Sequence, residues 1–212
     1  MPRPSAQWFF DVVSPFSYLH LKQFGQLHPF LELKFVPVLF AGLLRHWGNK
    51  GPAELPSKRV HSYRYCTWVA SKHGIRFRMP PRHPFNPLAT QRLLVALGSS
   101  RPHVEKTFDF IYGQGGDPEL DWPDLCGALA VTDADTLIAD PVVKQQLVAN
   151  TEQAAEAGVF GVPTFVVRGQ LFWGGDTIAW MNEFVDDPEM FDRGEMSRAA
   201  QIEFGAASKA LT

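Results

Sequence analysis

The sequence predicts an α/β protein in which a β-α-β unit and a β-β-α unit flank a long helical middle segment. Residues 31–35 (Leu-Glu-Leu-Lys-Phe) alternate apolar and polar side chains, which is typical of a half-buried strand. Apolar side chains in residues 16–24 recur at helical spacing instead. Two short apolar runs, 164–167 and 170–173, surround a turn signal near the C-terminus. With 212 residues the chain suits one domain with a large insertion, or two modest domains sharing a core.

The N-terminal unit begins with residues 6–12 (Ala-Gln-Trp-Phe-Phe-Asp-Val), which are typical of a buried strand. Ser14 fits the N-cap of the following helix, and Pro15 fits its first position, where a missing N–H costs nothing. A second strand follows over residues 31–35. Because a β-α-β connection normally joins parallel strands, we expect these two strands to lie parallel in one sheet.

The middle of the chain predicts four helices, each with a start signal and most with a terminal glycine. They begin at Asn86-Pro87, at Ser100, at Asp121 or Asp124, and at Asp140-Pro141. The first, second and fourth are expected to end at Gly98, Gly113 and Gly158, and the third is short and centred near Leu125.

The C-terminal unit consists of the two apolar runs, which predict a hairpin around Arg168-Gly169, and a last helix that Asp176 can cap. The complete order is that of a thioredoxin-like βαβ–ββα core with an all-helical insertion domain. We expect residues 5–40 and 159–187 to form the discontinuous thioredoxin-like domain. Residues 41–158 are then the helical insertion, and residues 188–212 a C-terminal tail.

Composition excludes several classes of protein. The formal net charge of −2 gives no basic footprint for nucleic acid, and no apolar run is long enough to cross a membrane. The N-terminal residues lack the apolar segment of a signal peptide, so a cytoplasmic location is the default expectation. Cys66 and Cys126 are expected to be reduced thiols packed in helices. The 7 histidines lack metal-ligand spacing, so no metal is predicted.

The first chemical feature is Ser14-Pro15-Phe16-Ser17, directly after the first strand. A helix N-terminus presents unpaired N–H groups and the positive end of the helix dipole, so it favours an anion. Thioredoxin-like oxidoreductases carry a Cys-x-x-Cys pair here, whereas this chain has serines at both positions, which disfavours disulfide exchange. The remaining function is to bind the thiolate of another molecule, and the alternative is that Ser14 is only a helix cap.

The second feature is Gly161-Val162-Pro163-Thr164, before the returning strand. We expect a cis Val162-Pro163 bond that leaves the backbone groups of Val162 free to pair with a peptide. Glutathione, a tripeptide with a central cysteine, fits that slot. The third feature is Trp173-Gly174-Gly175-Asp176, whose N–H groups and carboxylate suit the γ-glutamyl end of the same tripeptide. The alternative for Asp176 is an N-cap alone.

Three segments together resemble the 2-hydroxychromene-2-carboxylate isomerases and their relatives, the kappa-class glutathione transferases. They are residues 11–19 (Asp-Val-Val-Ser-Pro-Phe-Ser-Tyr-Leu), 48–52 (Gly-Asn-Lys-Gly-Pro) and 160–164 (Phe-Gly-Val-Pro-Thr). The resemblance runs from about residue 7 to 186. It implies a glutathione-binding thioredoxin-like domain in an enzyme that is usually a homodimer.

The resemblance also implies roles for individual residues. Ser14 stabilises the glutathione thiolate, and Asn49, Val162, Gly175 and Asp176 bind the tripeptide. The family usually has Asp-Arg at the start of the last helix, whereas this chain has Asp176 followed by threonine. Cations that could compensate for the missing arginine are Lys50, Arg59 and Arg168.

The substrate pocket is expected between the first β-α-β unit and the helical insertion. Its candidate residues are aromatic side chains for the walls and cations or histidines for a carboxylate: Phe16, Phe40, Arg45, His46, Trp47, His83, Phe85 and Trp173. Each aromatic side chain has the alternative role of a core residue. The segment 83–87 has the alternative of turn chemistry with an N-cap at Asn86. Asp11, close to Ser14, is interpreted as a hydrogen-bonded structural acid rather than a base.

The resemblance implies a glutathione-dependent isomerase that acts on a 2-hydroxychromene-2-carboxylate-like aromatic keto acid. Glutathione sulfur adds to the conjugated acid, the former double bond rotates, and the sulfur leaves. The motifs around residues 47–54 favour this reading. The alternatives are a kappa-type transferase or peroxidase acting on other electrophiles, and a non-catalytic thioredoxin-like binder of glutathione or peptides. The expected partner is thus a small aromatic carboxylate or electrophile.

Overall fold

The computed structural model describes residues 3–203 and 205 and contains one four-stranded sheet with the strand order β2-β1-β3-β4. The strands are β1 (Ser5–Phe10), β2 (Glu32–Pro37), β3 (Thr164–Val167) and β4 (Gln170–Trp173). β1 and β2 are parallel, whereas β3 is antiparallel to both β1 and β4. The predicted parallel pair and the predicted hairpin are therefore confirmed.

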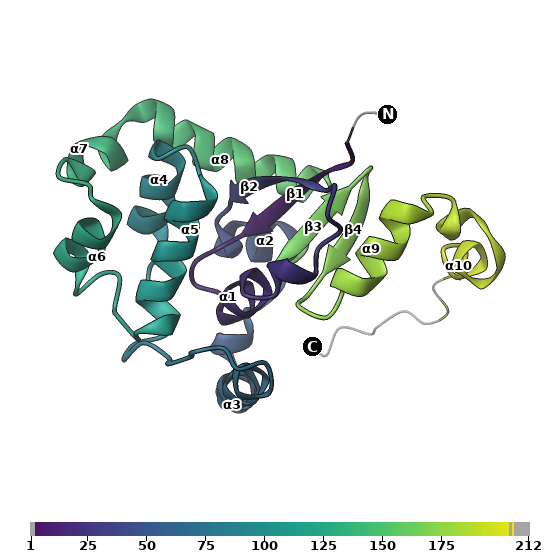
Figure 1. Ribbon diagram of the computed structural model, residues 1–212, viewed down its shortest axis with the longest axis horizontal. Coiled ribbons are helices and arrows are strands. Elements are labelled where there is room, and N and C mark those ends of the chain that lie inside the picture. Colours follow the sequence, from purple (N-terminus) through teal and green to yellow (C-terminus); the bar gives the residue numbers. More distant parts are fainter. Residues whose placement is uncertain (1–2, 204, 206–212) are drawn as a thin grey trace.

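Helices cover both faces of the sheet (Figure 1). Trp8 and Phe10 point to one face, where they share a core with residues of α1 (Pro15–Leu21) and α9 (Ile178–Asp186). The intervening Phe9 points to the other face. There it packs in a second cluster with α2 (Phe40–Trp47) and α8 (Pro141–Glu156). This division follows from the period of two in a strand.

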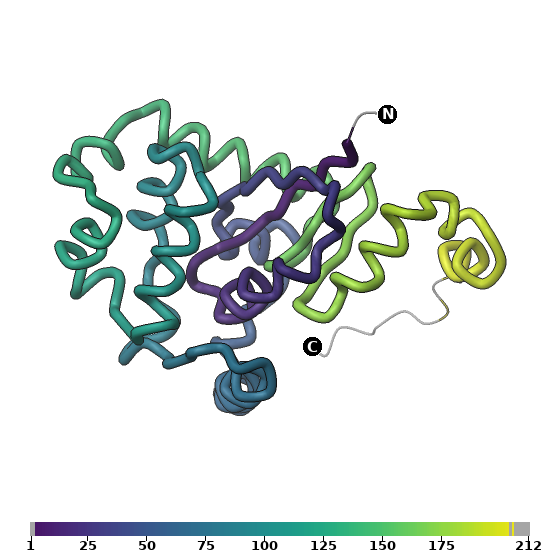
Figure 2. Tube along the Cα trace, in the orientation of Figure 1, coloured from purple at the N-terminus to yellow at the C-terminus, as the bar shows by residue number. Residues whose placement is uncertain are grey.

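Of the remaining helices of the middle segment, the first lies by itself beside α1 and the others gather beside the β2 edge of the sheet, as Figure 1 and Figure 2 show. They are α3 (Pro56–Lys72), α4 (Leu88–Ala96), α5 (Arg101–Phe108), α6 (Trp122–Leu129) and α7 (Ala134–Ala139). α5 continues into the π-helix η3 (Asp109–Gly113). All four predicted helices are confirmed, as α4, α5 with η3, α6 and α8. The helices α2, α3 and α7 were not predicted.

The helical segment and the sheet share a continuous core. The rings of Trp8 on β1 and Phe108 on α5 lie 6.3 Å apart, and Leu93 of α4 belongs to the same cluster. The proposed domain boundaries stay a prediction. The segment called a tail contains η4 (Met190–Asp192) and α10 (Gly194–Ala199), while residues 204 and 206–212 lie outside the described part.

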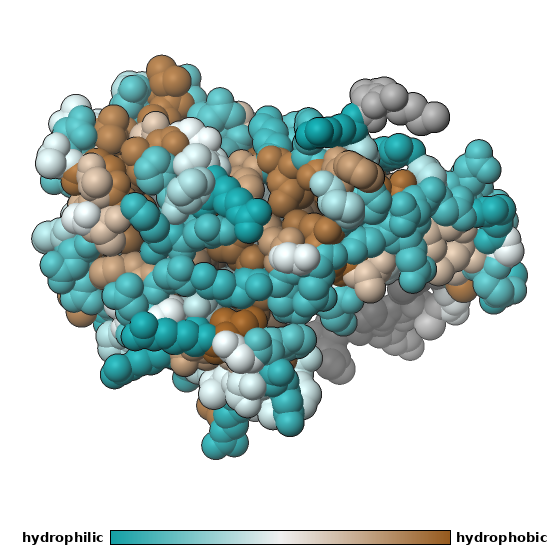
Figure 3. Space-filling view, in the orientation of Figure 1, coloured by the Kyte–Doolittle hydropathy of each residue, from teal (hydrophilic) through white to brown (hydrophobic). Residues whose placement is uncertain are grey.

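The surface in Figure 3 is mainly hydrophilic, with separate hydrophobic patches between charged side chains. Across residues 3–203 and 205, no helix combines the length and apolar character that a membrane span requires. Both cysteines are free and buried, as predicted, and burial raises the pKa of Cys66 to about 12.

Candidate active site

Ser14 lies at the N-terminus of α1, where its hydroxyl oxygen accepts a hydrogen bond from the Ser17 N–H at 3.3 Å. Pro15 occupies the first helical position, which confirms the predicted cap. The same hydroxyl donates to the carbonyl oxygen of Val162 at 3.4 Å, although the two residues are 148 positions apart in the chain. Ser14 and Val162 are each 7% exposed. The fold therefore brings the first two predicted features together.

The Val162-Pro163 peptide bond is cis, as the sequence predicted. Within the described residues the Val162 N–H has no hydrogen-bond partner, and the carbonyl accepts only from Ser14. The neighbouring turn is held by the Thr164 hydroxyl, which donates to the Gly161 carbonyl at 2.7 Å. Val162 thus presents a backbone donor and a weakly held acceptor beside the first turn of α1.

Asp11 fixes the loop that leads into Ser14. Its side chain is fully buried, and its two carboxylate oxygens accept hydrogen bonds from the backbone N–H groups of Val13 at 3.0 Å and Phe40 at 2.8 Å. Burial raises the pKa of Asp11 to about 7, although both hydrogen bonds oppose that rise. The interpretation as a structural acid is confirmed, because the carboxylate joins the Ser14 loop to the start of α2.

Two further side chains hold the carbonyl of Val13. The Tyr112 hydroxyl donates to it at 2.8 Å, and Nε2 of His83 lies 2.6 Å from it. Since a carbonyl only accepts hydrogen bonds, Nε2 of His83 carries the proton, and Nδ1 then accepts from the Tyr63 hydroxyl at 2.6 Å. Burial lowers the pKa of His83, which favours this neutral form. Both ring nitrogens are hydrogen-bonded within the protein, so His83 would have to exchange one of these bonds to bind a substrate carboxylate, and that role stays a prediction.

Gln91 supports the same loop from α4. Its side-chain amide donates to the carbonyls of Phe10 at 3.1 Å and Val38 at 2.7 Å, at the ends of two neighbouring strands. The sequence analysis overlooked Gln91, Tyr63 and Tyr112. The sequence does contain an indication for Gln91, because it is a polar residue on the same buried face of the predicted helix as Leu94.

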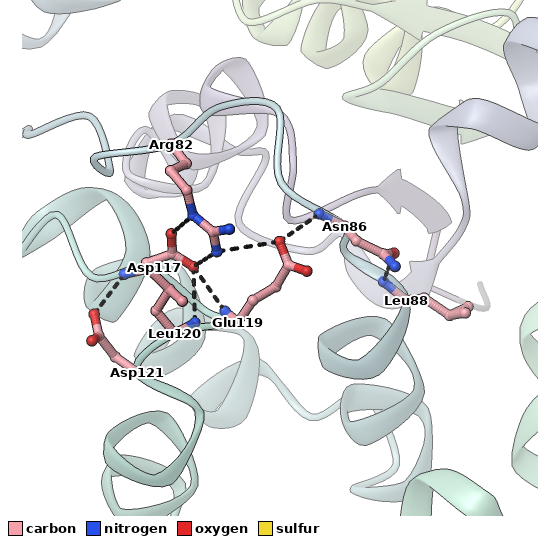
Figure 4. Close-up of polar contacts among 7 residues, drawn as sticks. All are labelled: Arg82, Asn86, Leu88, Asp117, Glu119, Leu120 and Asp121. Carbon is pink, nitrogen blue, oxygen red and sulfur yellow. Dashed lines mark hydrogen bonds and ion pairs between the residues drawn. The ribbon is translucent and has the colours of Figure 1, made fainter.

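Figure 4 shows how the segment that carries His83 is held in place. Arg82 donates two hydrogen bonds to the carboxylate of Asp117, at 2.6 and 2.8 Å, and this lowers the pKa of Asp117 to about 2. Asn86 N–H donates to Glu119, and Asn86 Oδ1 accepts from Leu88 N–H at 3.1 Å, so Asn86 caps α4 from just before its start.

Phe85, in the same segment, is 5% exposed and belongs to the main core cluster. Its ring is packed inside the protein, and its predicted place in the wall of a substrate pocket stays a prediction. The alternative of a core residue is confirmed for it.

The C-terminal end of α2 lies beside the loop that contains Val162. Nε1 of Trp47 donates to the Val159 carbonyl at 2.9 Å, and the Trp47 ring is still 44% exposed. Arg45 and His46 are exposed on the last turn of α2, and Asn49 is exposed just after Gly48, which ends the helix in the left-handed region at φ 65°. Of these residues, Trp47 contacts the loop that leads to Val162, and the ligand contacts of all four stay predictions.

The segment after β4 is tied to the same loop. The Gly174 N–H donates to the Pro163 carbonyl at 3.0 Å. Thr177, not Asp176, is the N-cap residue of α9, and its hydroxyl donates to the Gly174 carbonyl at 3.0 Å. The expectation that Asp176 caps this helix is wrong. Its carboxylate is exposed and accepts no hydrogen bond from the described residues.

Two other predicted residues also have clear positions. Trp173 is 52% exposed and lies over Gly161, where a Cβ atom would be 2.6 Å from the indole nitrogen. Arg168 occupies the turn between β3 and β4 at φ 50°, at the opposite end of β3 from Val162. Arg168 therefore does not replace the arginine that the related proteins have after Asp176.

Comparisons with known proteins identify the family of this chain. Residues 7–186 match the model of the DSBA-like thioredoxin domain. Glutathione S-transferase kappa 2 of Caenorhabditis elegans is 28% identical over 211 residues, covering 88% of this chain and 93% of the relative. A 2-hydroxychromene-2-carboxylate isomerase of Sphingobium xenophagum is 26% identical, covering 85% of this chain and 97% of the relative.

A solved structure of 2-hydroxychromene-2-carboxylate isomerase shares the fold. It superposes with a TM-score of 0.73 at 20% identity, covering 94% of this chain and all of the other. The predicted fold class and the resemblance stated from sequence are confirmed. The chain belongs to the DSBA-like thioredoxin domain family, and its relatives include the kappa glutathione transferases and the 2-hydroxychromene-2-carboxylate isomerases.

Proposed function

We propose that this protein binds glutathione, holds its thiol as a thiolate at Ser14, and uses that sulfur to isomerise a conjugated aromatic keto acid. The observation that carries the proposal is the contact between the Ser14 hydroxyl and the Val162 carbonyl at the N-terminus of α1. A peptide docked on Val162 therefore has its side chain next to an oriented hydroxyl and the positive end of a helix. Both stabilise an anion.

Binding uses the backbone of Val162. Its N–H and carbonyl pair with the cysteinyl residue of the tripeptide as a neighbouring strand does. Gly175 and Asp176 take the γ-glutamyl end, and the exposed carboxylate of Asp176 pairs with the ammonium group. Asn49, at the end of α2, takes another part of the tripeptide. Because Thr177 brings no cation, the ion pair that an arginine supplies in related proteins is missing here.

The chemistry needs little besides the thiolate. The sulfur adds to one end of the conjugated double bond, and the electron pair moves toward the carbonyl of the keto acid. After rotation about the resulting single bond, the electron pair returns, the double bond re-forms and the thiolate leaves. Arg45 and His46 are our candidates to bind the carboxylate of the substrate, and Trp47 is our candidate to contact its ring. No net oxidation, reduction or group transfer takes place.

A second candidate is a kappa-type glutathione transferase, which the relative from Caenorhabditis elegans favours. It uses the same thiolate and retains the adduct with the electrophile. A peroxidase on the same site is a variant of this candidate. The two functions share the sulfur site and differ in the electrophile pocket, so an assay with two substrates separates them.

The test compares wild type with Ser14→Ala, with and without glutathione, on a chromene carboxylate and on chlorodinitrobenzene. We expect glutathione-dependent turnover of the chromene carboxylate, reduced by one to a few powers of ten in the variant, as the loss of one oriented donor commonly causes. Turnover of chlorodinitrobenzene alone favours the transferase. Equal rates in variant and wild type refute the role of Ser14, and failure to bind immobilised glutathione refutes the function.

Location and assembly belong to the same proposal. We infer a cytoplasmic enzyme, where glutathione is abundant and reduced, and a homodimer as the resemblance implies. Light scattering coupled to size-exclusion chromatography measures the mass in solution. A mass close to 23.8 kDa contradicts the homodimer without affecting the assigned site.

A further inference from the structure

The Ser14 hydroxyl has one proton to donate, and among the described residues its acceptor is the Val162 carbonyl. The oxygen–oxygen distance of 3.4 Å is well beyond the ordinary range for such a bond, about 2.7–2.8 Å, so the interaction is weak. The same carbonyl is the acceptor that a peptide docked on Val162 needs for its own N–H. The hydroxyl that is to stabilise a thiolate thus competes with the ligand for one backbone acceptor.

We propose that glutathione binding exchanges the donors at this carbonyl. The inference rests on the proposed function. The cysteinyl N–H of the tripeptide takes over the Val162 oxygen, and the Ser14 O–H turns to the ligand sulfur. The thiol proton leaves to solvent, and the sulfur keeps the electron pair as a thiolate.

The exchange requires little movement of the protein. Ser14 Oγ also accepts from the Ser17 N–H at 3.3 Å, and it can keep this contact while its hydrogen rotates about the Cβ–Oγ bond. The loop before Ser14 is fixed by Asp11, Tyr112 and His83, so the oxygen has no reason to shift. Only the direction of the hydroxyl hydrogen changes.

If the donors are exchanged, loss of the Ser14 hydroxyl affects ligands with and without a thiol in opposite directions. Stabilisation of the thiolate alone does not predict this difference. A tripeptide without a thiol still displaces Ser14 from the Val162 carbonyl but offers the freed hydroxyl no new acceptor. Removal of the hydroxyl therefore favours such a ligand, while it disfavours glutathione itself. A carbonyl oxygen has two lone pairs, and if Val162 accepted both donors at once, this opposite response would be absent.

The experiment uses glutathione and γ-glutamyl-α-aminobutyryl-glycine, in which a methyl group replaces the thiol. Calorimetric titration measures their affinities for wild type, Ser14→Ala and Ser17→Ala, and ultraviolet absorbance measures the bound thiolate. We expect Ser14→Ala to bind the methyl analogue about two- to fivefold more tightly, the equivalent of one weak hydrogen bond. The same variant should raise the pKa of the bound glutathione thiol.

Ser17→Ala is the matched control, because its hydroxyl is buried and has no hydrogen-bond partner among the described residues. It should bind both ligands as wild type does. Equal or weaker binding of the methyl analogue by Ser14→Ala, with thiolate formation intact in wild type, overturns the exchange and leaves the proposed function standing. Failure of wild type to bind glutathione overturns both.

Discussion

Asp11→Asn tests the buried carboxylate whose hydrogen bonds connect the Ser14 loop to the start of α2. The pKa of the Asp11 carboxyl is raised by burial from 3.8 to about 7, so the folded protein binds a proton that the unfolded chain has already released. The contribution of Asp11 to stability is therefore greatest below the unfolded value of 3.8 and falls as pH rises toward about 7. The gap between the two values corresponds to about 4 kcal/mol, at about 1.4 kcal/mol per pH unit.

Asparagine has no proton to lose, so the variant lacks this part of the pH dependence. Its amide has one acceptor oxygen for the two N–H groups of Val13 and Phe40, so it is less stable than wild type at low pH. Urea unfolding of both proteins between about pH 4 and pH 8 measures the difference in unfolding free energy. We expect that difference to shift by about 4 kcal/mol in favour of the variant as pH rises. A difference that stays constant across this range refutes the reasoning.

Three further changes have definite expected outcomes. Asp117→Asn removes a carboxylate whose pKa is lowered to about 2 by the hydrogen bonds from Arg82. Wild type should lose stability as pH falls from 3.8 to about 2, because the Asp117 carboxylate is then protonated. An acid-unfolding curve of the variant that equals that of wild type contradicts this expectation. Ser17→Ala removes a buried hydroxyl without a partner among the described residues, so its unfolding free energy should equal or exceed that of wild type, and a loss above about 1 kcal/mol argues against it. Gly161→Ala places a Cβ atom 2.6 Å from the Trp173 indole nitrogen; we expect a cost of about 1–3 kcal/mol, measured as a lower Tm, and an unchanged Tm is the opposing result.

The features with local signals were the ones predictable from sequence. The cap at Ser14 depends on a Ser-Pro pair after an apolar strand, and the hairpin depends on two apolar runs around a two-residue turn. Both are fixed by residues a few positions apart. α3 has no such signal. Only Cys66 and Ala70 of its 17 residues are buried, so its sequence lacks apolar residues that recur at helical spacing.

The parts of the site that could not be predicted depend on choices between neighbouring residues or on long-range contacts. Asp176 and Thr177 are both good capping residues, and only the backbone conformation decides that Thr177 takes the position. His83 and Phe85 alternate along a turn. Tertiary packing turns the first to the Val13 carbonyl and the second into the core. The pairing of Ser14 with Val162 joins distant segments, so no local signal in the sequence indicates it.

The central claim is that Ser14 and the N-terminus of α1 hold the sulfur of bound glutathione as an anion. The most direct measurement is the pKa of that thiol, from a titration of thiolate absorbance in the complexes of wild type and Ser14→Ala. A free cysteine thiol has a pKa of about 8.5. The account predicts a value below neutrality in wild type and a clear rise in the variant. A thiol that stays protonated at neutral pH in the wild-type complex, or the same pKa in both proteins, contradicts it.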